Sequence, residues 1–316
     1  MRGLVGTVSA LVVVSAGAIV LTQQQPAVRC DRACLNALVD TYLAAVVAHD
    51  PSRVPIASGA KLVENVTPTK PGEGLWKTAS AAPTTFRIYV PDPVSAQVGF
   101  IGVMQEEGKP VQLALRLKVQ QGRITEMEHL IARNLSERSL GNLQTPRPGL
   151  LAPVPADERG SREQLLRIGA SYYDALDDNE GSKAPFAHDC ARRENGMQTS
   201  TNSAPAAPGA MGTLGALGCA AQISTGTFAY IDSIDHRRVE IADVEMGLVF
   251  GLSHFRHSMK QKFVTIKGVA GVEKMDLNIN PFDLPAAHIY KVRAGQIHEI
   301  EAMGFTTAYN STTGWE

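Results

Sequence analysis

The second half of this 316-residue chain repeats the first, and this limits the possible folds more than any other sequence feature. At a shift of 130 positions the halves align without a gap from Tyr42 on Tyr172 to Asn65 on Asn195. Between these ends the identities are Ala45 on Ala175, Ser52 on Ser182, Pro55 on Pro185, Ala57 on Ala187 and Glu64 on Glu194. At a shift of 173, GRITEMEHL (122–130) matches GQIHEIEAM (295–303). The sequence therefore predicts two copies of one module, in agreement with its length.

A proline-rich stretch separates the two copies. Residues 142–160 hold four prolines and show neither helical nor strand periodicity, which is typical of a semi-rigid linker. The expected segments are copy one at 30–140, the linker at 141–160 and copy two at 161–310. The two shifts differ by 43, so copy two carries about 43 extra residues. We expect these as loops or an added hairpin at 203–218 and 258–285.

The N-terminus and the cysteines indicate where the protein is delivered. Residues 1–29 contain an uncharged apolar stretch after Arg2, which predicts a signal peptide or, if it is not cleaved, a membrane anchor. An even number of cysteines suits an oxidising compartment. Of three connectivities we favour Cys30 with Cys34 and Cys190 with Cys219, because each pair then lies within one copy. The sequence thus predicts a secreted or periplasmic protein.

The composition excludes several kinds of partner. With 30 basic and 31 acidic side chains, no net charge attracts the chain to nucleic acid or to an anionic membrane. Membrane contact is therefore expected only through an uncleaved N-terminal segment. The sequence contains no paired Cys-x-x-Cys, calcium-type loop or Gly-rich phosphate motif, so we expect no metal and no cofactor. The expected partner is a small-molecule ligand, and the oligomeric state is left open.

Each copy is predicted to begin with an amphipathic helix and to continue as strands. Apolar residues recur at helical spacing from Leu35 to Val46 and from Leu165 to Leu176, so one stripe of each helix should be buried. Asp31 and Ser161 are the expected N-caps. Apolar and polar residues alternate from Leu113 to Val119, which predicts a strand with one wet face. This order is the α+β pattern of a helix packed on a curved antiparallel sheet.

The order of helix, proline-containing turn, short strand with Glu-Asn, and a meander ending in GRITEMEHL resembles the SnoaL-like (nuclear transport factor two-like) superfamily. The resemblance covers about residues 30–135 and 161–307. It implies two cone-shaped modules, each with a pocket between its N-terminal helices and a concave sheet. Members include isomerases, dehydratases, cyclases, epoxide hydrolases and non-catalytic proteins, so the fold constrains the reaction only weakly.

Copy two is predicted to hold the small-molecule site, and copy one to be structural. Copy two has charged residues where copy one has apolar ones, namely Asp174, Asp177, Arg192 and Arg193. Tyr172 lies on the buried helix stripe, where its hydroxyl can donate a hydrogen bond to a substrate oxygen. Asp174 and Asp177 fall on other faces of the helix and are expected in solvent.

The Arg193-Glu194-Asn195 run supplies further candidates. Glu194 is a candidate general acid or base, and Arg193 and Asn195 are candidate substrate-binding groups that polarise a carbonyl. In the structural alternative, Glu194 pairs with a neighbouring arginine and Asn195 forms a tight turn, and the Glu-Asn pair of copy one favours this alternative. Paired glutamates of the second matched segment are expected on the outer sheet face and without a catalytic role: Glu126, Glu128, Glu299 and Glu301.

Two of the eight histidines lie in strand-like segments. His254 continues one apolar face of its strand, and His288 shares a face with Tyr290, which becomes a candidate substrate contact. If these strands are neighbours, both imidazoles line one wall and titrate near neutrality. His236 and His257 lie in polar stretches and are expected to be exposed.

These patterns predict an exported enzyme that uses cofactor-free acid/base chemistry, of lyase, dehydratase or isomerase type, on a neutral organic substrate. Tyr172, Glu194 and His254 or His288 would move the protons. The alternative is a non-catalytic secreted module that binds an apolar ligand, with Trp76 of copy one as a candidate contact if it is not a core residue. A third hypothesis is an architectural protein with side chains filling both cones.

Overall fold

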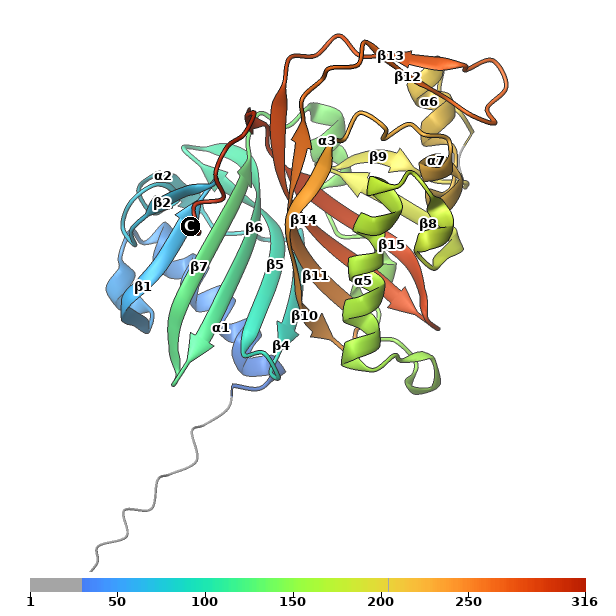
Figure 1. The fold of residues 1–316 in the computed structure, drawn as a ribbon. Helices are drawn as coiled ribbons and strands as arrows, with labels where there is room; N and C mark the ends of the chain where they lie inside the picture. The colour runs from blue at the N-terminus through green and yellow to red at the C-terminus, as the bar shows by residue number, and fades with distance from the viewer. Residues whose placement is uncertain (1–29, 204) are drawn as a thin grey trace, which may run out of the picture.

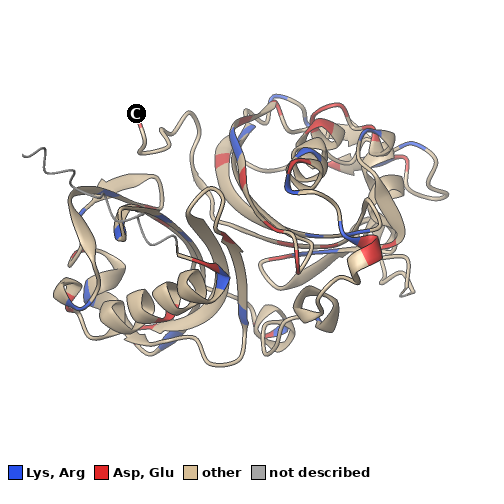
Figure 2. Cartoon of the chain, turned by 90° about the horizontal axis from the view of Figure 1, so that it is seen from below, with Lys and Arg blue, Asp and Glu red and all other residues tan. Residues whose placement is uncertain are grey.

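The computed structural model describes residues 30–203 and 205–316. The predicted leader at 1–29 lies outside these residues. The described chain forms two α+β halves of one design, each a curved sheet with its own long helix on the concave side (Figures 1 and 2). This arrangement confirms the predicted fold class and the duplication. Within the described ranges, no helix has the length and apolar character needed to span a membrane.

The first half is built around helix α1 (Arg32–Val47). Its other elements are β1 (Ile56–Glu64), β2 (Thr67–Thr69), α2 (Leu75–Thr78), β3 (Ala79–Ala81), β4 (Arg87–Asp92), β5 (Gln97–Glu106), β6 (Lys109–Gln120) and β7 (Arg123–Ala132). The strands form one sheet in the order β2-β1-β7-β6-β5-β3, and β4 also pairs with β5. The predicted N-cap is confirmed, because the Asp31 carboxylate accepts a hydrogen bond from the Cys34 amide.

The second half repeats this design around α5 (Arg162–Asp177), which Ser161 caps as predicted. Its sheet consists of β8 (Phe186–Glu194), β9 (Met197–Ser200), β10 (Ser233–Asp243), β11 (Leu248–His257), β14 (Phe282–Arg293), β15 (Gln296–Gly304) and β16 (Thr307–Ala308). The strand order is β10-β11-β14-β15-β8-β9, and β16 pairs with β14. The extra residues form α6 (Ala210–Gly215), α7 (Cys219–Ser224) and a hairpin of β12 (Phe263–Thr265) and β13 (Lys274–Asp276). Side chains of both insertions share a small core of their own.

Both sheets are mixed, whereas the sequence predicted antiparallel ones. β1 runs parallel to β7, and β8 runs parallel to β15. Parallel neighbours need a long crossover connection, and here the intervening elements of each half provide it. The first long strand of each half therefore lies beside the last one, which places residues of β8 next to residues of β15.

The outer faces of the two sheets pack against each other. The predicted alternation at 113–119 is confirmed, but the polar face is not wet, because Gln112 and Arg116 are buried. Apolar side chains of both halves form a shared core there, including Ile88, Ile101, Leu130, Ile241, Phe250, Leu252, Ile289 and Met303. The C-terminal tail also crosses to the first half (Figure 1), where the Trp315 ring lies 5.0 Å from Cζ of Arg116. The second copy thus covers the outer sheet face of the first copy, which would be exposed to solvent in a single module.

Equivalent ion pairs join the halves near the start of each long helix. Arg32 of α1 binds Asp243 of β10 at 2.6 Å, and Arg162 of α5 binds Asp92 of β4 at 2.7 Å. Arg162 is the counterpart of Arg32 at the shift of 130. The two halves therefore meet about an approximate twofold axis, as two subunits do in an isologous dimer.

The proline-rich stretch contains regular structure, contrary to the expectation of a linker without helical periodicity. Its short elements are the end of α3 (Glu137–Asn142), α4 (Pro148–Leu151) and a 3₁₀ turn at Ala156–Glu158. The Arg147 guanidinium donates to the carbonyl oxygens of Ala191 and Ile300, at 3.0 and 2.7 Å. The stretch forms helical turns because it is held along β8 and β15, a contact that its local sequence does not reveal.

Candidate functional site

A cavity of about 50 Å³ lies in copy two, between α5 and the concave face of the sheet. Its polar lining consists of Tyr172, Arg192, Glu194, Tyr230, His257 and His288. The rest of the lining is aliphatic or aromatic, with Phe228 and Phe255 among the larger side chains. Since a water molecule takes up about 30 Å³ in the liquid, this space suits a small chemical group.

Helix α5 directs Tyr172 into the cavity. Tyr172 and Leu176 lie one turn apart on the buried stripe, and both line the space. Burial raises the pKa of Tyr172, so the phenol is protonated at neutral pH. Nη1 of Arg192 donates to the Tyr172 hydroxyl at 3.3 Å, which leaves the phenolic proton for another acceptor.

Arg192 and Glu194 lie two residues apart on β8, so both reach the concave side. The Arg192 side chain also donates to the Thr199 hydroxyl at 2.9 Å and to the Gln222 amide oxygen at 2.6 Å. In the described part of the chain, no carboxylate forms an ion pair with Arg192. Glu194 is half-buried, and its carboxylate likewise has no ion-pair partner among these residues. The pairing of Glu194 with a neighbouring arginine, one of the two sequence interpretations, is therefore absent.

Two histidines of neighbouring strands share the concave face. His288 of β14 pairs with Gly251 of β11, and His257 lies six residues further along β11, on the same side. Burial lowers the pKa of His257 to about 4, and burial with the nearby Arg192 charge lowers the pKa of His288 to about 3. Both imidazoles are therefore neutral at pH 7 and able to accept a hydrogen bond, and the prediction that His288 titrates near neutrality is wrong. One ring nitrogen of His288, Nδ1, lies 3.2 Å from the hydroxyl of Tyr173.

His254 does not line this cavity, so the prediction that it shares a wall with His288 is wrong. Strands β11 and β14 are neighbours as expected, but His254 pairs with Pro285, which places it on the opposite face. There its Nε2 lies 3.1 Å from the Ser311 hydroxyl. Register decides the face of every strand residue, and the sequence does not state the register. His257, which was expected to be exposed, is buried and is the β11 histidine that reaches the cavity.

Three predicted substrate contacts lie outside the cavity lining. Arg193 turns away, and its Nη1 donates to the Asn142 carbonyl at 3.2 Å. Asn195 has a φ of 46°, and its side chain binds the backbone of Gly304 at 2.9 and 3.0 Å, as the tight-turn alternative predicted. Tyr290 is fully buried in the core of copy two.

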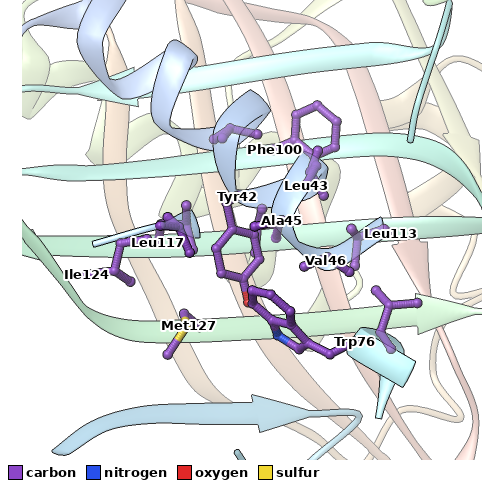
Figure 3. Packing of buried hydrophobic residues seen from close by; sticks show 14 of the residues in the cluster. Tyr42, Leu43, Ala45, Val46, Trp76, Phe100, Leu113, Leu117, Ile124 and Met127 are labelled. Carbon is purple, nitrogen blue, oxygen red and sulfur yellow. The ribbon is translucent and has the colours of Figure 1, made fainter. Parts of the chain in front are cut away.

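In copy one, large side chains fill the corresponding space (Figure 3). Trp76 is fully buried and meets the Tyr42 ring edge-on, with ring centres 5.2 Å apart, so it is a core residue. The Tyr42 hydroxyl lies 2.8 Å from Nε2 of His129, and Nδ1 of His129 lies 3.3 Å from the Glu64 carboxylate. This buried polar chain was not predicted from the sequence, although the shift of 173 places His129 opposite Ala302 and so marks a difference between the copies.

Both favoured disulfides are present. Cys30 is bonded to Cys34, and Cys190 of β8 is bonded to Cys219 of α7. The second bond fixes α7 against β8, next to the Gln222 side chain that binds Arg192. Within residues 30–203 and 205–316, no group of three or more His, Cys, Asp or Glu side chains is arranged to hold a metal ion.

Two of the four glutamates that were expected on the outer sheet face are buried instead of lying in water. Glu128 and Glu301 are counterparts at the shift of 173. Burial on its own would raise the pKa of Glu128, but Arg238 at 2.6 Å and Arg116 at 3.3 Å hold that pKa below its usual value. Glu301 has Arg147 at 3.2 Å, and burial raises the pKa of Glu301 to about 7. The pKa of the equivalent carboxyl group is therefore lowered in copy one and raised in copy two.

The fold and the site define a tandem-repeat α+β protein with a polar cavity in its second copy. The chain belongs to the family described as a domain of unknown function, DUF8021, which matches residues 28–131 and 158–304. The two matched segments correspond to the two copies. A comparison with curated proteins gives no match.

Several solved structures are similar to part of the chain. A candidate polyketide cyclase from Xanthomonas campestris pv. campestris is 17% identical, with a TM-score of 0.29 and coverage of 45% of this chain and 90% of that one. A candidate SnoaL-like polyketide cyclase from Jannaschia sp. CCS1 is 14% identical, with a TM-score of 0.27 and coverage of 46% and 89%. A protein from Sphaerobacter thermophilus is 18% identical, with a TM-score of 0.26 and coverage of 31% and 94%. Similarities at this level carry no activity over to this chain.

Proposed function

We propose that this protein is an exported small-molecule enzyme that performs cofactor-free acid/base chemistry in the copy-two cavity, of lyase, dehydratase or isomerase type. The observation that carries the proposal is the meeting of Tyr172, Glu194 and His288 with Arg192 and His257 around one buried cavity. A carboxylate, neutral imidazoles and fixed hydrogen-bond donors are the groups needed to remove a proton next to a carbonyl.

The chemistry follows from where each group lies. A substrate carbonyl oxygen beside Tyr172 would accept the phenolic hydrogen bond, and the nearby Arg192 charge would further stabilise the enolate formed when the adjacent carbon loses its proton. Glu194 would take that proton, because its carboxylate has no ion-pair partner in the described chain. Protonated Glu194 would then return the proton to another carbon or to a leaving hydroxyl. The neutral rings of His257 and His288 would orient the substrate as hydrogen-bond acceptors or donors.

Export is part of this proposal. Two disulfides in the described chain suit an oxidising compartment, and the apolar stretch at 3–21 has the composition of a signal peptide. N-terminal sequencing of the product from a secreting host tests this point. We expect a chain that starts shortly before Cys30, whereas an intact Met1 on a cell-associated product would indicate an anchor.

Hydrogen exchange in D₂O tests the chemistry across a whole class of carbonyl compounds at once. The full chain is incubated with a panel of small ketones, hydroxy ketones and keto acids, and NMR follows the loss of the C–H signal next to each carbonyl. We expect catalysed exchange, and a rate at least about 100-fold lower in Glu194→Gln, which keeps the shape but removes the base. His254→Gln, on the opposite face of the sheet, is the matched control and retains the exchange rate. Binding of a panel member without any exchange would favour the non-catalytic binding module instead.

A further inference from the structure

Arg192 is a buried cation whose described hydrogen-bond partners are all neutral. The residue is 3% exposed, and its guanidinium donates to Thr199, Gln222 and Tyr172. The Phe228 ring, 4.8 Å from Cζ, adds a cation–π contact. Since a guanidinium carries five N–H donors, two remain after these three bonds. The cavity wall therefore presents a positive charge with unused donors.

Two other arginines with little exposed surface have carboxylate partners. Arg116, which is 6% exposed, binds Glu128 at 3.3 Å, and the partly buried Arg147 binds Glu301 at 3.2 Å. Such pairing is the usual way to offset the cost of removing a charge from water. Arg192 departs from this pattern, although Glu194 stands on the same strand.

The charge and the cavity occur together in copy two. At the shift of 130 the counterpart of Arg192 is Leu62, and at the shift of 173 the counterpart of Ala302 is His129. Copy one folds around the same frame with neither the cation nor the smaller side chain. The fold of the module therefore does not require an arginine at this position. This indicates that Arg192 binds a ligand in the cavity.

We infer that Arg192 binds a carboxylate group of the substrate, so that the site takes small carboxylic acids or the acidic end of a larger one. This inference rests on the proposed function and replaces the neutral substrate that the sequence predicted. The two unused N–H donors of the planar guanidinium fit two carboxylate oxygens, which leaves the phenolic proton of Tyr172 for the carbonyl oxygen of the same substrate. A cavity of about 50 Å³ admits a carboxylate and its neighbouring carbon. Glu194 lines the same cavity, so the positive charge of Arg192 must offset the repulsion between the Glu194 carboxylate and the substrate anion.

Propionate and propionamide are suitable probes, because they have nearly the same shape and differ in charge. Binding to the full chain is measured by thermal shift and by NMR line broadening, in a buffer without carboxylates. We expect wild-type protein to bind propionate at least about tenfold more tightly than propionamide. Arg192→Leu, which introduces the copy-one residue, should remove this preference. Arg193→Leu is the matched control, because Arg193 points to Asn142, and it should retain the preference.

The outcomes separate this inference from the proposed function. Equal binding of the two probes, or binding of neither, overturns the carboxylate assignment, while exchange on neutral ketones would still support the catalysis. Preference for propionate without exchange on any panel compound supports the carboxylate site and removes the catalysis. The wild-type comparison needs no variant, so it decides the question even if Arg192→Leu does not fold.

Discussion

The two cones share one frame, yet one is filled and the other is hollow. In copy one Trp76 and His129 occupy the space beside the helix, and Leu62 contributes an apolar wall. In copy two Ala302 replaces the imidazole and Arg192 replaces the leucine. The difference shows that one frame can hold either a packed core or a polar cavity, depending on the side chains at equivalent positions and on the inserted segments around them.

The tyrosine common to both copies makes the same point. Tyr42 bonds to His129, whereas Tyr172 accepts from Arg192 and borders the cavity. The shared residue belongs to the shared frame, because both rings pack under their helices. Its neighbours, which differ, decide whether the hydroxyl is part of the core or available to a ligand.

Trp76→Ala should have the largest effect on the difference between the filled copy one and the hollow copy two. Removing this fully buried ring leaves a void in copy one, and we expect a loss of about 3 to 5 kcal/mol in the free energy of unfolding. Urea unfolding measures it. Trp315→Ala is the control, because Trp315 is only half-buried, and its cost should be clearly smaller. Equal and small costs would mean that copy one is not solidly packed.

The stabilisation that each disulfide provides should increase with the length of the loop that it closes. Cys190 and Cys219 are 29 residues apart, and on chain-entropy grounds the double alanine variant should lose about 3 to 4 kcal/mol. Cys30 and Cys34 are 4 residues apart, and the corresponding loss is about 2 kcal/mol. Thermal unfolding gives both values. Only the first variant should also weaken propionate binding, since that bond holds α7 against β8, and a reversed order would contradict this account.

Ala302→His transplants the copy-one imidazole into copy two. The added ring should fill the cavity beside Tyr172 and slow the D₂O exchange reaction by about 100-fold or more. Stability should change by no more than about 3 kcal/mol, because copy one already accommodates this residue in the same frame. His129→Ala is the companion variant, and it should leave exchange unchanged while lowering stability. Full exchange activity in Ala302→His would place the reaction outside this cavity.

The paired glutamates predict opposite responses to pH. The pKa of Glu301 is raised to about 7, so its contribution to stability is present below its usual pKa and is lost as pH rises through 7. Glu301→Gln should therefore be more stable than wild type at about pH 8, by about 2 kcal/mol, and gain nothing at about pH 4. The pKa of Glu128 is lowered, so its contribution is present at neutral pH and is lost in acid. Glu128→Gln should lower the free energy of unfolding at neutral pH. Urea unfolding of both variants between about pH 4 and about pH 8 measures these effects, and the same dependence on pH in both would contradict this account.

Much of the frame could be predicted from the sequence, because local patterns and repetition determine it. Helical spacing identified α1 and α5, alternation identified β6, and the repeat located the second copy. The same repeat supported the disulfide pairing, since each cysteine pair lies within one copy. It also placed Tyr172 and Glu194 on positions that line the cavity. These conclusions hold because side-chain direction within one element follows from sequence spacing alone.

Only the tertiary structure decided which faces are buried and which side chains meet. The register of β11 against β14 put His257, and not His254, beside His288, since a change of one residue turns a side chain to the other face. Packing of the second half on the first buried Glu128, and the proline-rich stretch with Arg147 covers Glu301, although local alternation assigns both glutamates to water. Both outcomes depend on partners far away along the chain, and no local pattern of residues records them.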